Sequence, residues 1–277
     1  MNESLGRMNC LLQPLDGLEA FARLREDVGA GKLCALYGAD DSQRVHLLAG
    51  LMGAAKRPML ILAPNDSLAI HMVEDLNVLT AGAALESTGF EHSGLQSRLA
   101  RPEGSDNLGA ARFLPARDVS FVKSSAASRD LAMRRIEVIG ACLTGACRVL
   151  VVPVDAALHR MAPVDRFRDR MLTLRAGEQV EPNDLMAKLT AAGYERVQLV
   201  EARGQCALRG GILDVYPVGE ANALRVEFFD DEIDSIRSFD VMTQRSISNR
   251  ESAHIYPAKE FLLTQEERLY AAQRIQY

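Results

Sequence analysis

One segment near the N-terminus has the residue types and position of a phosphate-binding loop. Such a loop has the pattern G-x-x-x-x-G-K-[ST] between a strand and a helix; its glycines free the backbone, its lysine neutralises phosphate and its hydroxyl holds Mg²⁺. Gly38 fits the first glycine, but the later motif positions are occupied by Gln43, Arg44 and Val45. Two aspartates inside the loop add carboxylates where phosphates would lie. Because nucleotide binding requires all three lost groups, we predict a degenerate, non-functional loop.

A second segment, residues 225–229, has the residue types of a protein-binding surface. Because side chains alternate along a strand, Phe229 shares one face with Arg225 and Glu227. An aromatic side chain on a charged face is covered by its own chain, simply exposed, or bound by a partner, and an aromatic with arginine is typical of a binding hot spot. Two glycines after Arg209 predict a bend or bulge between two strands, which would fix the direction of that arginine.

The composition excludes several classes of function. The 277 residues suggest about two structural units. The formal charge of −5 argues against a broadly basic nucleic-acid coat. No apolar run approaches the roughly 20 residues that span a bilayer, and no signal peptide is visible, so we expect a cytoplasmic protein without membrane contact. Cys142 and Cys147 are spaced C-x4-C without a second pair, so we predict no metal site, and we expect no cofactor and no catalytic residue.

The elements around the phosphate loop are those of a parallel sheet. Helices are predicted over 18–28, 42–52, 66–79 and 129–143, the last capped by Ser128, and buried strands over 32–37, 58–63 and 148–153. Alternation of strand and helix predicts parallel strands with right-handed crossovers.

After residue 170 the pattern changes to consecutive short strands. Residues 171–175 lead into this region, a helix is predicted over 181–192, and antiparallel strands are predicted over 196–200, 205–208, 212–216, 225–229 and 232–239. Asp230 and Asp231 predict a two-residue hairpin turn between the last two strands. Residues 171–240 hold seven basic and thirteen acidic side chains, a net charge of −6, which favours a protein partner over DNA.

Two stretches of this second region resemble a known family. They are GQCALRGGILDVYP (204–217) and LRVEFFDDEIDSIRSFD (224–240), followed by TQRS (243–246). They resemble the N-terminal module of the bacterial transcription-repair coupling factors (Mfd), which is related to the excision-repair protein UvrB. The resemblance is dense over about 145–260.

The resemblance implies an α/β fold with an inserted α+β domain. Residues 1–170 would form a RecA-like domain 1A with a degenerate phosphate loop and a shortened 1B-like stretch near 89–128. Residues 171–240 would form domain 2, with antiparallel strands. Residues 241–277 would return to domain 1A and begin a truncated C-terminal segment.

The resemblance also implies a function. In this family domain 2 docks on UvrA, and the docking residues correspond here to Arg209, Arg225 and Phe229. The chain would be a non-catalytic module that brings nucleotide excision repair to stalled RNA polymerase. The parent protein would be an ATP-dependent DNA translocase, which contacts polymerase and DNA through downstream domains that are missing here.

Two alternatives remain open on the sequence alone. A UvrB-like ATP-dependent damage-recognition protein needs an intact phosphate loop and an aromatic hairpin, whereas the stretch near 89–128 holds only Phe90, Phe113 and Phe121. A DNA-binding fragment would use the mildly basic stretch 98–135. Thr264 and Glu267 predict a capping box for a helix that reaches the last residue without a stop signal, so we expect a fragment of a longer protein.

Overall fold

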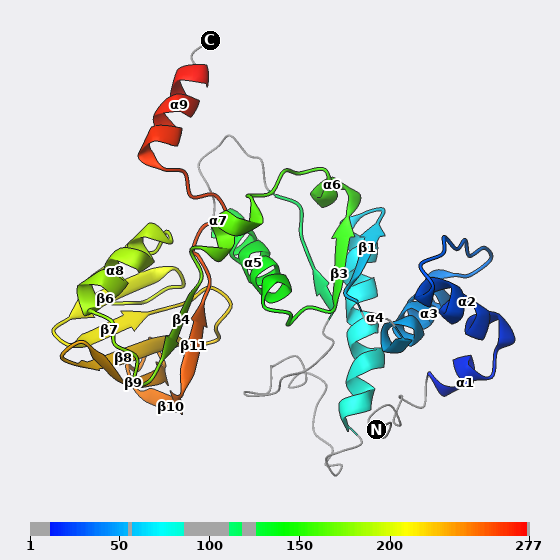
Figure 1. Cartoon of the computed structure of the whole chain (residues 1–277), viewed down its shortest axis with the longest axis horizontal. Helices are drawn as coiled ribbons and strands as arrows, with labels where there is room; N and C mark the ends of the chain where they lie inside the picture. Colours follow the sequence, from blue (N-terminus) through cyan, green and yellow to red (C-terminus); the bar gives the residue numbers. More distant parts are fainter. Residues whose placement is uncertain (1–11, 55–56, 86–110, 118–125, 276–277) are drawn as a thin grey trace. The chain divides into compact units, whose positions relative to one another are not determined.

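The computed structural model describes residues 12–54, 57–85, 111–117 and 126–275 (Figure 1). It divides into two compact units. Unit 1 comprises Met1–Ala116 and Ala141–Leu158, and unit 2 comprises Arg117–Gly140 and His159–Tyr277. Most of the 1B-like stretch near 89–128 lies outside the described residues. Within the described ranges, none of the helices combines the length and apolarity needed to cross a bilayer.

Unit 1 is built on a three-stranded parallel sheet. Its elements are α1 (Gln13–Asp16), α2 (Glu19–Gly29), α3 (Asp41–Ala54), β1 (Met59–Ala63), α4 (Asp66–Leu85), β2 (Ala111–Phe113), β3 (Val149–Pro153) and α6 (Val154–Ala157). The central strand is β3, since Met59 of β1 and Ala111 of β2 both pair with Val149. The expected parallel sheet is therefore confirmed.

Helices α1 and α2 of unit 1 pack closely against α3. Its buried Val45 joins Phe21 of α2 and Leu15 of α1 in one apolar core. A Cβ atom at Gly50 would lie 2.7 Å from side-chain atoms of both Leu15 and Phe21. The absence of a side chain at this position therefore permits the close approach of α3 to the first two helices.

The buried strand expected over 32–37 is wrong. This segment forms no strand, and its Leu33 and Tyr37 side chains are almost fully exposed. Gly31 and Gly38, which flank the segment, adopt φ values of 73° and 79°, so the chain leaves the extended conformation immediately before and after it. The apolar composition favoured a strand, but a strand also needs a neighbour for its backbone groups. The sheet of unit 1 provides none for this segment in the described structure.

Unit 2 is built on a six-stranded sheet with the order β10-β9-β8-β7-β6-β5. Its elements are α7 (Val164–Arg168), β4 (Leu172–Arg175), α8 (Pro182–Ala191), β5 (Glu195–Arg196), β6 (Gln205–Arg209), β7 (Ile212–Val215), β8 (Ala223–Phe229), β9 (Glu232–Phe239), β10 (Ser246–Arg250), β11 (Ser252–Ile255) and α9 (Gln265–Ile275), while α5 (Ala126–Leu143) has residues in both units. Neighbouring strands are antiparallel except for β5, which is shorter than expected and runs parallel to β6. A separate β11-β4 pair completes the unit. Both β10 and β11 follow residue 240, and the domain boundaries drawn from the sequence remain a prediction.

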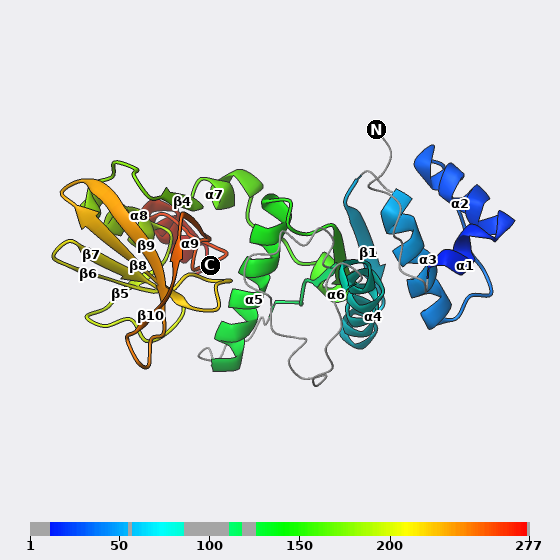
Figure 2. The same cartoon turned by 90° about the horizontal axis from the view of Figure 1, so that it is seen from below.

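Helix α8 covers one face of the six-stranded sheet (Figure 1 and Figure 2). Its Leu185 and Leu189 are buried in one core with Leu213, Val226 and Ile236 of the strands. Because side chains alternate along a strand, the residues between them point to the other side of the sheet. The core therefore fixes which side chains of β7, β8 and β9 point away from α8.

Most local signals in unit 2 agree with the structure. Asp230 has a φ of 58° in the turn that pairs Phe229 with Glu232, so the two-residue hairpin is confirmed. The capping box is also confirmed, since the backbone N–H of Thr264 donates to Glu267 Oε2 at 2.9 Å and that of Glu267 donates to Thr264 Oγ1 at 3.1 Å. The expected cap at Ser128 is wrong, because α5 already begins two residues earlier, where alanines favour the helix.

Two arginines of unit 2 converge on one buried carboxylate, Glu260. Its oxygens accept hydrogen bonds from Arg135 Nε at 2.9 Å and Nη2 at 3.0 Å, and from Arg117 Nη2 at 2.9 Å. The side chains of Arg135 and Glu260 are only 1% and 7% exposed. Burial raises the pKa of Glu260, but the hydrogen bonds and charges of the two arginines outweigh it, so the pKa lies below its ordinary value.

Replacing Glu260 by Gln should destabilise unit 2 by about 3 kcal/mol or more, because the buried Arg135 loses its counter-charge. Urea unfolding at neutral pH measures this loss, and the exposed Glu266→Gln is the matched control. Since the folded pKa of Glu260 is lowered, its contribution is complete above the unfolded value of about 4.3 and is lost as pH falls through the folded pKa. A Glu260→Gln variant with wild-type stability and wild-type acid sensitivity would contradict this role.

Candidate protein-binding face

The sheet face opposite α8 carries charged and exposed side chains. We call it the open face; it comprises Arg209 of β6, Ile212 and Asp214 of β7, Arg225, Glu227 and Phe229 of β8, and Arg237 of β9. The strand register places these residues together, since Ile212 pairs with Glu227 and Asp214 pairs with Arg225. Arg225 in turn pairs with Arg237 across β8 and β9. The predicted alternation along β8 is therefore confirmed.

Asp214 is the most buried charged group on the open face, with 1% of its side chain exposed. Its carboxylate accepts hydrogen bonds from Arg225 Nε at 2.7 Å and from Arg225 Nη2 at 2.9 Å. Arg209 Nη2 donates to the same carboxylate at 2.9 Å. Two arginines that are distant along the chain are thus held on one buried anion.

Arg225 is fixed by more than its ion pair. Its Nη2 atom also donates to Gln244 Oε1 at 3.2 Å, and its guanidinium lies 4.5 Å from the centroid of the Phe239 ring. The hydrogen bonds with Asp214 raise the pKa of Arg225 above its ordinary value. Only 18% of the side chain is exposed, compared with 51% for Arg209. Arg209 therefore has more of its surface available to a partner than Arg225 has.

Phe229 lies at the end of β8 and is 80% exposed. The alternative in which its own chain buries it is therefore wrong. Two hairpin turns meet at this end of the sheet, since the backbone N–H of Phe228 donates to the Gly211 carbonyl at 2.8 Å. Gly210 adopts a φ of 59° in the predicted bend after Arg209. The exposed part of Arg209, the aromatic ring of Phe229 and the half-exposed Ile212 consequently share one end of the open face.

The partners of two acidic groups on this face were not predicted from the sequence. Asp214 was not predicted to hold the arginines, and Glu227 was not predicted to accept a hydrogen bond from Arg237 at 2.9 Å and one from Ser235 at 3.0 Å. A signal was present, because each acidic residue lies opposite an arginine or a hydroxyl once the strands are paired. This signal can be recognised only when the register of β7, β8 and β9 is known.

In unit 1, the phosphate-loop residues form a self-contained turn at the start of α3. The backbone N–H of Gln43 donates to Asp40 Oδ1 at 2.7 Å, and the backbone N–H of Asp40 donates to Gln43 Oε1 at 3.1 Å. Arg44 folds back, with Nε on the Ala39 carbonyl at 3.0 Å and Nη1 on Asp41 Oδ1 at 3.1 Å. Val45 points into the core. The groups at this helix start are therefore engaged with one another.

Metal-ligating residues do not gather in the part of the chain that the structure describes, where no group of three or more His, Cys, Asp or Glu side chains could hold an ion. Cys142 and Cys147 are both free thiols. The hydrogen bond with Cys147 and, after it, burial raise the pKa of Cys142, whereas the same hydrogen bond lowers the pKa of Cys147.

Comparison with known proteins agrees with the geometry of unit 2. Residues 172–261 match the UvrB interaction domain, a range that includes the whole open face. The chain is 29% identical over 273 residues, 94% of its length, to a transcription-repair-coupling factor of Bacillus subtilis (strain 168). It is 37% identical over 153 residues, 55% of its length, to that of Staphylococcus aureus (strain USA300). The resemblance to the transcription-repair coupling factors is confirmed.

The similarity is to one region of these relatives. The chain covers 21% of the Bacillus subtilis coupling factor and 13% of the Staphylococcus aureus one. The matched domain also extends beyond residue 240, through β10 and β11. The sheet of unit 2 and the UvrB interaction domain thus occupy nearly the same part of the sequence.

Replacing Asp214 by Asn should lower the free energy of unfolding by about 2 kcal/mol or more, because Arg225 and Arg209 lose a buried counter-charge. Urea unfolding measures the loss. Asp234→Asn, at an exposed position of β9 in the same sheet, should change stability by about 0.5 kcal/mol or less. Equal stability of the two variants would show that Asp214 does not organise the face.

Proposed function

We propose that this chain is a non-catalytic recruitment module of a transcription-repair coupling factor and that its open face binds UvrA. Through this contact it would bring nucleotide excision repair to stalled RNA polymerase. The parent protein would be an ATP-dependent DNA translocase that contacts polymerase and DNA through domains outside this chain. The observation that carries the proposal is the 80% exposed Phe229 beside an arginine pair, within residues that match the UvrB interaction domain.

The chemistry of the open face favours a protein partner. An exposed aromatic ring supplies apolar area that a partner can desolvate, and arginine is the charged residue most enriched in binding hot spots. Arg225 loses little further freedom on binding, because Asp214, Gln244 and Phe239 already fix its guanidinium. Such preorganisation reduces the entropy cost of association. Acidic groups of the partner would complement Arg209 and the remaining surface of Arg225.

The geometry of the phosphate loop supports a non-catalytic role for the chain. At the start of a helix that binds phosphate, backbone N–H groups point at the anion. Here the N–H of Gln43 is taken by the Asp40 carboxylate, which would also repel a phosphate. Arg44, the residue at the lysine position, is held by Ala39 and Asp41. We therefore propose that this loop is a degenerate phosphate loop that binds no nucleotide.

Phe229→Ala should weaken binding to UvrA by about 2 kcal/mol or more, roughly 30-fold in Kd, without lowering the melting temperature. Tyr270→Ala, an exposed aromatic of α9 in the same unit, should leave binding unchanged. Titration calorimetry and thermal unfolding of each variant give the two quantities. A folded Phe229→Ala variant with wild-type affinity would remove Phe229 from the site.

Arg209→Ala should also weaken binding to UvrA, and its effect should diminish at high salt, because the exposed part of this arginine is open to screening. Arg225→Ala should weaken binding with a smaller dependence on salt, and it should also destabilise the sheet by leaving Asp214 without its main partner. Measuring Kd at two salt concentrations, with unfolding curves, separates the two roles. An Arg209→Ala variant with unchanged affinity at low salt would contradict the proposed charge contact.

Titration of ATP with Mg²⁺ should give no saturable heat and no shift of the melting temperature, because the helix start of α3 is occupied by its own carboxylate. The related ATPase hypothesis requires the opposite result. Saturable binding in the micromolar range, about 8 kcal/mol in free energy, would overturn the non-catalytic proposal.

A further inference from the structure

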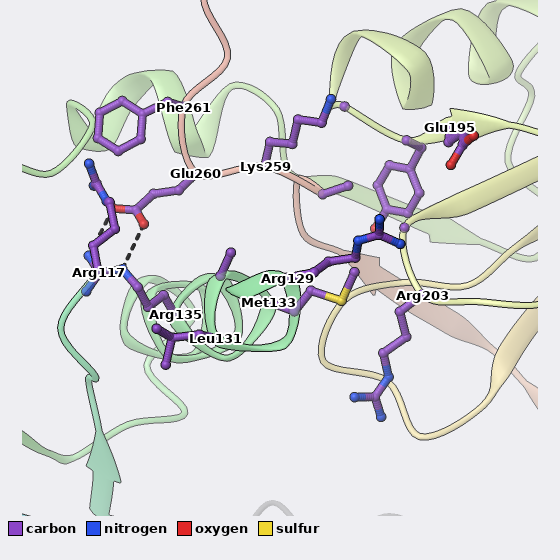
Figure 3. Close-up of a pocket in the computed structure, with 15 residues that line it drawn as sticks. Arg117, Arg129, Leu131, Met133, Arg135, Glu195, Arg203, Lys259, Glu260 and Phe261 are labelled. Carbon is purple, nitrogen blue, oxygen red and sulfur yellow. Dashed lines mark hydrogen bonds and ion pairs between the residues drawn. The ribbon is translucent and has the colours of Figure 1, made fainter. Parts of the chain in front are cut away.

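Unit 2 contains a cleft of about 690 Å³ that the proposed function does not use (Figure 3). We call it the α5 cleft. Its walls are α5, the residues between α8 and β5, the turn before β6 and the segment that follows β11. Ligand-binding clefts span about 300–1,000 Å³, so this one has room for several side chains of a bound segment.

Positive charge dominates the lining of the α5 cleft. Five cationic side chains and two carboxylates line it, although the whole chain carries a net charge of −5. One of the carboxylates, Glu260, is already neutralised by Arg117 and Arg135, which converge on it in Figure 3. The charge that is left to attract a ligand comes from the other three cations, which only Glu195 offsets.

These three cations are Arg129, Arg203 and Lys259, and all are exposed. Within the described ranges, no ion pair joins any of them to a carboxylate. They come from α5, from the turn before β6 and from the segment after β11. Three parts of the fold thus contribute positive charge without an ionic partner to the lining of one cleft, and the guanidinium of Arg203 also lies 5.7 Å from the centroid of the Tyr216 ring. Such a lining is the complement of an acidic ligand.

The apolar part of the lining favours aliphatic side chains over nucleic-acid bases. Met133 lies beside the cleft wall at Gly204, where a Cβ atom would be 3.7 Å from its methyl group. The ring of Phe261 is stacked by Arg117 at 4.2 Å. Tyr194 is buried, and its hydroxyl donates to the Tyr256 carbonyl at 2.8 Å. Base stacking needs free aromatic faces, whereas a methionine adapts to aliphatic groups.

We propose that the α5 cleft binds an acidic peptide segment of a partner protein. Carboxylates of the segment would pair with Arg129, Arg203 and Lys259, and an aliphatic side chain between them would pack on Met133. This site is separate from the open face and does not depend on UvrA binding.

The test uses a fluorescein-labelled peptide of alternating glutamate and leucine, with anisotropy as the readout. The double variant Arg129→Ala/Arg203→Ala should weaken binding at least about tenfold, with an unchanged melting temperature because both side chains are exposed. Arg134→Ala, on the exposed surface of the same helix and outside the cleft, is the matched control and should bind as wild type. Phe229→Ala should also bind as wild type, which separates this proposal from the proposed function.

Replacing the leucines of the peptide by glutamines should weaken its binding to the wild-type chain, since the apolar contact with Met133 is lost. Three results would overturn the proposal: no saturable binding of the peptide, an equal loss in the Arg134→Ala control, or displacement of the peptide by a single-stranded oligonucleotide at lower concentration. The last would assign the cleft to nucleic acid.

Discussion

The packing of α8 against one face of the six-stranded sheet determines what the other face can do. Leu185 and Leu189 bury Leu213 and Val226 on the covered side, and because strand side chains alternate, Asp214, Arg225 and Phe229 must point the other way. A slip of one residue in β8 would exchange the two sets and place charge in the core. The apolar contact thus specifies the open face without touching it.

A second consequence is that the open face carries a buried carboxylate. Asp214 would be costly to bury alone, but three hydrogen bonds from two arginines offset that cost. Arg225 is thereby held rigidly within the sheet, whereas Arg209 and Phe229 leave most of their side-chain surface exposed to a partner. The three residues share one face but have different physical roles, with Arg225 as the rigid element between an anion and an aromatic ring.

Much of this arrangement follows from the sequence alone. The alternation in β8, the Asp230-Asp231 turn and the helix before the sheet depend on local patterns, and so they could be predicted. The ion pairs of Asp214 depend on the register of β6, β7 and β8, which no local pattern contains. Strand β10 has one large apolar residue, Ile247, and gave too weak an alternation to be predicted. The strand predicted over 32–37 is wrong for the opposite reason. The apolar composition of this segment indicated a strand, but a strand forms only where a neighbouring strand elsewhere in the chain pairs with it.

The proposed contact with UvrA lies at the end of the open face where the two hairpin turns meet. Hydrogen–deuterium exchange of this chain, alone and with UvrA, tests it most directly because it requires no substitution. We expect slower exchange at the backbone amides of residues 209–212 and 229–232 in the complex, with exchange in α8 unchanged. Protection of α8 instead, or unchanged exchange at both turns in a complex that demonstrably forms, would contradict it.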